Sequence, residues 1–207
     1  TSMGSLLWRT SLLKLGHEIN RRTNPNAWKV RCFRRPNFSP DEEGRIITSK
    51  LKRLTGEEQA RYFDAVCQLG RANSFHFNTM IMSQRSPKAA DELLKKMARL
   101  RISPCLITYT NIIKLEVKFG SLDRAEARYQ EMIEQGITPS VVTHSILIDG
   151  HGKRGRLRDA IGAWDRMIAV GIEPNEYSYT SLIDACVKRG DMARAEELFN
   201  ALVKGER

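Results

Sequence analysis

An internal repeat with a period of 35 residues is the feature that most constrains how this chain can fold. When residues 106–140, 141–175 and 176–207 are aligned, similar residues recur at the same places in each segment. The recurring residues are a glycine, a small residue, a bulky aromatic residue, and a methionine or leucine: Gly120, Gly155, Gly190; Ala125, Ala160, Ala195; Tyr129, Trp164, Phe199; Met132, Met167, Leu202. A fixed period of about 20–50 residues is typical of proteins built from stacked structural units.

Each segment has the pattern of two helices joined by a turn. In the middle segment the second helix is expected over about 156–170, because apolar residues follow an i, i+3, i+4, i+7 stripe: Leu157, Ala160, Ile161, Trp164 and Met167. Gly155 permits the tight turn before it, Gly171 can cap its C-terminus, and Pro174 prevents further helix. Trp164, by its place in the aromatic series, is expected to be a buried residue that stabilises the stack. Such helix pairs cannot bury their apolar faces alone, so we expect them to stack on one another.

The middle segment, VVTHSILIDGHGKRGRLRDAIGAWDRMIAVGIEPN, resembles the pentatricopeptide repeat. The alternative is the tetratricopeptide repeat, which is also a helical hairpin but has a period of about 34 residues. The period of 35 and the Gly-Ile-x-Pro endings at 136–139 and 171–174 favour the pentatricopeptide family. The resemblance implies an all-α fold, a right-handed α-solenoid of stacked helix-turn-helix repeats with a concave surface.

The chain is predicted to divide into an arm, a cap and four repeats. The clear repeats are 106–140, 141–175 and 176–207, and a weaker repeat, 74–105, is three residues shorter than the period and lacks the usual turn glycine. Residues 41–73 are predicted to form a degenerate capping helix pair, with helices over 45–54 and 57–69.

Residues 1–40 differ from the rest in charge. They hold eight Lys or Arg residues and one acid, a net charge of +7, whereas residues 106–207 carry −1 and the whole chain +10. An Arg-rich, acid-poor segment is typical of an organellar transit peptide, and the alternative is an extended basic arm of the mature protein. Such an arm cannot form its own core, so it would lie on the solenoid, on RNA or on another protein. Its candidate contact residues are Arg9, Arg21, Arg22, Trp28, Lys29, Arg31, Arg34 and Arg35.

The resemblance also implies which repeat residues would read RNA. In helical-repeat RNA binders each repeat meets one base through two or three side chains, and in this family these are the fifth and last residues of a unit. The pairs here are Asn78 with Cys105, Thr110 with Ser140, Ser145 with Asn175, and Thr180 without a partner; Cys105 and Ser140 depart from the usual Asp or Asn. By resemblance, Ser with Asn favours adenine, Asn in fifth place favours pyrimidines, and Thr favours purines.

The second residue of each unit would sandwich the base, which gives Phe75, Ile107, Val142 and Tyr177. A purely structural interpretation stays open, because Thr110, Ser145 and Thr180 are also ordinary residues for the start of a helix.

The sequence offers little other chemistry. It contains no HExxH, CxxC, GxxxxGK[ST] or GxSxG motif and no apolar run of about 18 residues. We therefore expect no catalytic residue, metal, cofactor, small-molecule substrate or membrane span. Two functions remain: an RNA-binding subunit of an organellar ribonucleoprotein such as a mitochondrial ribosome, or a protein-binding scaffold of a respiratory or photosynthetic complex without RNA contact. The resemblance implies a mitochondrial location, with the plastid as the alternative.

Overall fold

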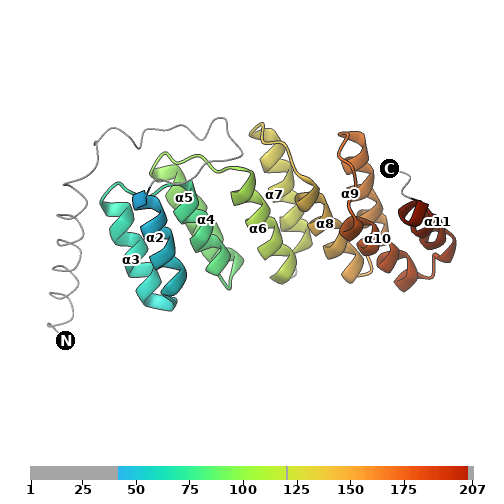
Figure 1. Ribbon diagram of the computed structural model, residues 1–207, viewed down its shortest axis with the longest axis horizontal. Helices are drawn as coiled ribbons and strands as arrows, with labels where there is room; N and C mark the ends of the chain where they lie inside the picture. The colour runs from blue at the N-terminus through green and yellow to red at the C-terminus, as the bar shows by residue number, and fades with distance from the viewer. Residues whose placement is uncertain (1–41, 120, 205–207) are drawn as a thin grey trace.

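The computed structural model describes residues 42–119 and 121–204, and these form ten α-helices and no strand (Figure 1). The helices are α2 (Glu42–Arg53), α3 (Gly56–Gln68), α4 (Ser74–Ser83), α5 (Pro87–Arg99), α6 (Leu106–Phe119), α7 (Leu122–Glu134), α8 (Val141–Lys153), α9 (Leu157–Ala169), α10 (Glu176–Arg189) and α11 (Met192–Lys204). They follow one another in a single elongated row (Figure 1). The predicted all-α solenoid is confirmed. Residues 1–40, with all eight candidate arm contacts, lie outside the described residues.

The even-numbered helices pack directly on one another, α2 on α4, α4 on α6, α6 on α8, and α8 on α10. Each odd-numbered helix packs against the even-numbered helix that precedes it in the chain. Residues at equivalent places in successive units therefore form columns along the solenoid. The unit boundaries themselves stay a prediction from the sequence.

The helix ends follow from local sequence. Asn73, Ser140 and Asn175 precede α4, α8 and α10, and the side chain of each accepts a hydrogen bond from the backbone N–H three residues later. Such caps satisfy N–H groups that have no partner inside the helix. After α7 and α9 the chain turns at Gly136 and Gly171, whose φ angles are +71° and +73°.

The shorter unit makes the same turn differently. Arg101 follows α5 and has a φ of +55°, in the place where the later units have Gly136 and Gly171. A side chain strains the backbone in this left-handed region, and glycine does not. Before α5, where the usual turn glycine is missing, Gln84 is extended and Pro87 is the first residue of the helix.

Two apolar cores meet at α6. One core contains residues of α2 to α6, including Ile112, and the other contains residues of α6 to α10, including the adjacent Ile113. Helix α8 lies especially close to its neighbours: a Cβ atom on Gly150 would lie 2.7 Å from the Val117 side chain, and one on Gly152 would lie 2.9 Å from Ala185. These two glycines therefore allow close helix packing.

The recurring aromatic residues are not equally buried. Tyr129 is 1% exposed, Trp164 is half-buried with its ring 4.8 Å from that of Tyr179, and Phe199 is 55% exposed. The next first helix covers Tyr129 and Trp164, but no described helix follows α11. Trp164, which was expected to be buried, is therefore only partly buried, and none of the described helices covers Phe199.

Candidate nucleic-acid interface

The second-place residues form an exposed apolar column along α4, α6, α8 and α10. Phe75, Ile107, Val142 and Tyr177 are between 38% and 56% exposed, although each lies in the first turn of a well-packed helix. Two are aromatic and two aliphatic, so every side chain presents a flat or smooth apolar surface. Such surfaces can pack against the faces of RNA bases, which every base possesses.

The fifth-place residues lie deeper than the sequence alone suggests. Ser145 is 2% exposed and Asn78 6% exposed, Thr110 is half-buried, and Thr180 is exposed. The following unit covers the first three, whereas α10 has no described first helix after it. A base could therefore meet only the edge of Asn78, Thr110 or Ser145.

The structure brings the fifth and last residues of the first unit together. The Asn78 amide nitrogen donates to the Cys105 sulfur at 3.7 Å, and the Asn78 oxygen accepts from the Thr108 hydroxyl at 2.7 Å. Thr108 also accepts a hydrogen bond from the Cys105 backbone N–H at 3.1 Å. Burial alone would raise the pKa of the Cys105 thiol, but hydrogen bonds from Thr108 and Asn78 outweigh burial and lower it.

A similar arrangement joins Thr110 and Ser140. The Thr110 and Thr143 hydroxyl oxygens are 3.0 Å apart, and those of Thr143 and Ser140 are 3.3 Å apart. The third residue of the following unit, Thr143, therefore bridges the predicted base-reading pair, as Thr108 does one unit earlier.

The pair Ser145 and Asn175 has complementary hydrogen-bonding groups. The Ser145 hydroxyl donates to the Val141 carbonyl at 2.8 Å, so its oxygen is left as an acceptor. The Asn175 oxygen accepts from the Ser178 backbone N–H at 2.9 Å, which leaves its NH₂ group as a donor. The adenine Watson–Crick edge has an N6 amino donor and an N1 acceptor, which are the groups that this acceptor and this donor could each meet. Thr180 has no described last-place partner, and its hydroxyl donates to the Glu176 carbonyl.

A column of lysines borders the apolar column, and sequence analysis missed it. Lys118, Lys153 and Lys188 are exposed in the last turns of α6, α8 and α10. Each follows its second-place residue by eleven positions, which is about three helical turns, so both lie on the same helix face, roughly 16 Å apart. The spacing of 35 residues between the lysines was visible, but the net charge of −1 for residues 106–207 concealed it.

Asp149 lies close to this column and moderates its charge. The Lys153 ammonium donates to the Asp149 carboxylate at 2.7 Å, and this hydrogen bond raises the pKa of Lys153. Burial, followed by the neighbouring Asp149 charge, raises the pKa of Tyr177. The second-place residue of α10 and the lysine of α8 therefore belong to one continuous surface.

No group of three or more His, Cys, Asp or Glu side chains among the described residues could hold a metal ion. Within residues 42–119 and 121–204, no helix is long and apolar enough to cross a membrane.

The geometry and the comparisons agree on the family. A family model described as the pentacotripeptide-repeat region of PRORP matches residues 61–205. This chain belongs to the pentatricopeptide-repeat (PPR) family. Among curated proteins, the pentatricopeptide repeat-containing protein At5g10690 of Arabidopsis thaliana is 32% identical over 93 residues, which cover 44% of this chain and 16% of that protein.

Solved PPR structures have the same fold. The PPR domain of Arabidopsis thaliana protein-only RNase P 1, in complex with tRNA, has a TM-score of 0.65 at 19% identity, with 79% of this chain and 86% of that chain covered. PPR10, in complex with an 18-nucleotide psaJ RNA element, has a TM-score of 0.65 at 21% identity, with 80% of this chain and 25% of that chain covered. Nuclear RNase P 2 of A. thaliana has a TM-score of 0.61 at 18% identity, with 76% of this chain and 38% of that chain covered.

Proposed function

We propose that this chain is a non-catalytic subunit that binds single-stranded RNA in an organellar ribonucleoprotein, such as a mitochondrial ribosome. The observation that carries the proposal is the convergence of fifth- and last-place side chains, joined through Thr108 and Thr143, beside an exposed apolar column. The RNA complexes of two structural relatives support RNA as the class of ligand. The RNase P 1 match lies in the PPR domain of that enzyme, so the proposal does not include catalysis.

Three kinds of contact would contribute to RNA binding. The second-place residues would sandwich successive bases, the fifth and last residues would meet base edges, and the lysine column would lie against phosphates. Stacking of a base contributes about 1–3 kcal/mol, and phosphate contacts add a salt-dependent attraction that is independent of sequence. The Ser145 and Asn175 pair would favour adenine.

The basic segment 1–40 would add the largest electrostatic contribution, because its net charge of +7 exceeds that of any other part of the chain. We place its Arg and Lys residues on RNA phosphates and its Trp28 on a base or a protein surface. The proposed location is the mitochondrion, with the plastid as the alternative, in keeping with the family resemblance.

The lysine column gives a direct test. The variant Lys118→Ala/Lys153→Ala/Lys188→Ala should weaken binding to a random single-stranded RNA pool and flatten the slope of log affinity against log salt by about 2, because each phosphate contact contributes about 0.7. The matched control is Lys88→Ala/Lys95→Ala/Arg99→Ala, which removes three exposed charges from α5. Equal slopes for the two triple variants would contradict the proposed surface.

Deletion of residues 1–40 tests the arm. The truncated protein should lose most of its salt-sensitive binding, whereas Ser145→Ala/Asn175→Ala should change the preference at one base and little else. A truncated protein that kept its full salt response would place the binding surface on the repeats alone.

A protein-binding scaffold is the second candidate function, and α11 favours it. Met192, Phe199 and Val203 are exposed there, although the equivalent of Phe199 in an earlier unit, Tyr129, is buried. If this function is correct, RNA digestion should leave the chain bound to its complex, and Phe199→Asp should release it.

A further inference from the structure

We propose that Thr108 and Thr143 are positioning residues that set which hydrogen-bonding group the preceding fifth-place residue presents to an RNA base. The inference rests on the proposed function and concerns two side chains that the base would not touch. Both are completely buried third-place residues, each in the first turn of a first helix.

Thr108 fixes the orientation of the Asn78 amide. The Thr108 oxygen accepts from the Cys105 backbone N–H, so its own proton is free to be donated to the Asn78 oxygen at 2.7 Å. The Asn78 nitrogen then faces the Cys105 sulfur with one of its two N–H bonds. One lone pair of the Asn78 oxygen is occupied, and the remaining N–H is available as a donor toward a base.

Thr110 is an acceptor because its proton goes to the Leu106 carbonyl, and Thr143 favours that orientation by donating to the Thr110 oxygen. The Thr110 hydroxyl donates its single proton to the Leu106 carbonyl at 2.8 Å, so in the contact between the two hydroxyls Thr143 must be the donor. Thr143 in turn accepts from the Ser140 backbone N–H at 3.4 Å. Thr110 therefore keeps one lone pair for a base and presents an acceptor.

The following unit supplies an internal contrast. The Ser178 hydroxyl donates to the Asn175 backbone carbonyl at 2.7 Å, so its proton points away from the fifth-place Ser145. The third-place hydroxyl of this unit thus makes no hydrogen bond to the fifth-place residue, and the preference of Ser145 should not depend on the Ser178 hydroxyl.

The consequence is an opposite polarity in these two units, with a donor at Asn78 and an acceptor at Thr110. A donor at Asn78 favours bases that present acceptors, such as the N3 and O2 atoms of cytosine or the carbonyl oxygens of uracil. An acceptor at Thr110 favours bases that present N–H groups, such as adenine N6 or guanine N1. Loss of either threonine hydroxyl should relax discrimination at one base only, because each bridges a single pair.

The test measures base preference and stability separately. The full chain, Thr108→Val and Thr143→Val are each used to select from a pool of single-stranded RNA with ten random nucleotides, and bound RNA is sequenced. Valine keeps the shape of threonine but cannot form the hydrogen bonds, so each variant should lose about fivefold preference at one position and keep its preference elsewhere. Thr48→Val is the matched control, because Thr48 is buried on α2 and its hydroxyl has no hydrogen-bond partner.

Thr143→Ser and Ser178→Ala complete the set. Thr143→Ser keeps a hydroxyl and should keep the wild-type base preference, so it tests the inference even if Thr143→Val does not fold. Ser178→Ala should leave the preference for the base met by Ser145 unchanged. A purely structural role would lower the melting temperature and the overall affinity without altering base preference, and that result would overturn the inference. If the wild-type chain selects RNA with preferences that Thr108→Val and Thr143→Val retain, the inference alone fails. If the wild-type chain selects no RNA or shows no preference, the proposed base reading fails and this inference fails with it.

Discussion

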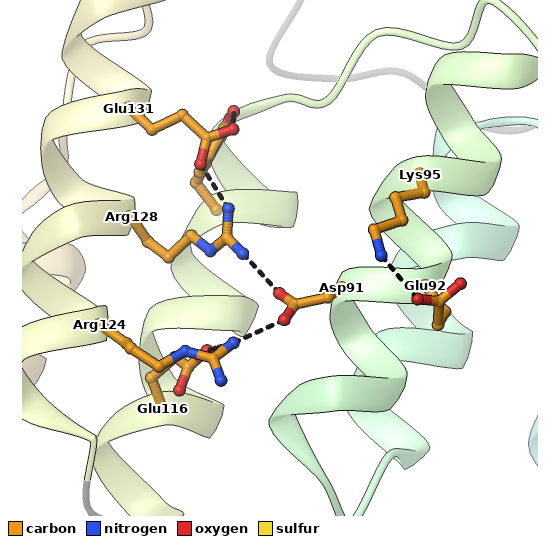
Figure 2. Close-up of polar contacts among 8 residues, drawn as sticks. Asp91, Glu92, Lys95, Glu116, Arg124, Arg128 and Glu131 are labelled. Atoms are coloured by element: carbon orange, nitrogen blue, oxygen red, sulfur yellow. Dashed lines mark hydrogen bonds and ion pairs between the residues drawn. The ribbon is translucent and has the colours of Figure 1, made fainter.

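Two neighbouring junctions between second helices use the same acidic position with different partners. At the junction of α5 and α7, Asp91 reaches between two arginines, with its carboxylate 2.6 Å from Arg124 and 2.5 Å from Arg128 (Figure 2). Arg124 also pairs at 2.9 Å with Glu116 of α6, whose side chain is 0% exposed. Arg128 also pairs with Glu131 of its own helix. A chain of alternating charges therefore joins α5, α6 and α7.

At the junction of α7 and α9 the acid is Glu126, and other residues replace the two arginines. The residues equivalent to Arg124 and Arg128 are Asp159 and Ala163. Glu126 pairs instead with Arg166 at 2.9 Å and with His151 at 2.8 Å. Arg166 and His151 stand where the first junction has the acids Glu131 and Glu116.

The comparison shows that the repeat constrains apolar and charged residues differently. A buried apolar residue packs against an apolar surface that recurs in every unit, so the same place in each unit stays apolar. An ion pair needs two residues, and either can move if its partner moves with it. The fold therefore keeps the acid at 91 and 126 and exchanges the positions of the bases around it.

The largest expected effect breaks the first junction. Arg124→Met removes the partner of Glu116 and leaves a fully buried carboxylate unpaired, which should lower the free energy of unfolding by about 3 kcal/mol. Urea denaturation monitored by circular dichroism would measure this change in the free energy of unfolding.

Two variants provide the controls for this effect. Glu116→Met replaces the buried charge with an apolar side chain while Arg124 keeps Asp91, so its stability should stay close to that of the wild type. Arg166→Met at the second junction should cost less than Arg124→Met, because Glu126 keeps His151. Equal losses for Arg124→Met and Glu116→Met would contradict the assignment of an unpaired buried charge.

The difference between the repeated apolar residues and the exchanged charged residues also explains which features of the fold and of the candidate site the sequence could predict. The period of 35 residues predicts the solenoid, and helix α9 at Leu157–Ala169 differs by one residue at each end from the expected 156–170. For the candidate site, the resemblance implied pairs such as Asn78 with Cys105, which the structure brings into contact. It did not predict that Asn78 is buried, because burial depends on a side chain of the next unit. The charge networks were unpredictable because their members exchange positions between units.

A smaller effect is expected at the turns that follow α5 and α7, where Arg101 and Gly136 both have a positive φ angle. Arg101→Gly should raise the free energy of unfolding by about 1 kcal/mol, because glycine adopts the φ of +55° without strain. Gly136→Arg is the reciprocal change and should lower it by a similar amount, since a Cβ at Gly136 would meet no atom within 4 Å and the loss is conformational only. Changes of the same sign in the two variants would show that Arg101 contributes contacts that outweigh its backbone strain.

The smallest expected effect is a difference in the acid response of the two junctions. Burial raises the pKa of Glu116 despite the opposing charge of Arg124. Burial would raise the pKa of Glu126 as well, but hydrogen bonds and charge from His151 and Arg166 outweigh it and lower that pKa. The two glutamates should therefore contribute to stability with opposite dependence on pH.

The sign follows from which state binds the proton more tightly. The folded state holds a proton on Glu116 more tightly than the unfolded state does, so the ionised Glu116 side chain destabilises the fold at neutral pH. This destabilisation should disappear as the pH falls through the raised pKa of Glu116 toward the ordinary glutamate value of about 4.3. The folded state holds a proton on Glu126 less tightly, so its stabilising contribution is complete above about pH 4.3 and is lost as the pH falls through its lowered pKa.

Glutamine variants isolate each contribution, because Gln cannot titrate in this range. The unfolding free energy of the wild type minus that of Glu116→Gln should increase as the pH falls from 7 toward about 4.3. The corresponding difference for Glu126→Gln should stay constant over that range and decrease below it. If both differences decreased together on acidification, Glu116 would be a stabilised ion-pair member like Glu126, and the two junctions would differ in the positions of their charges but not in their energetics.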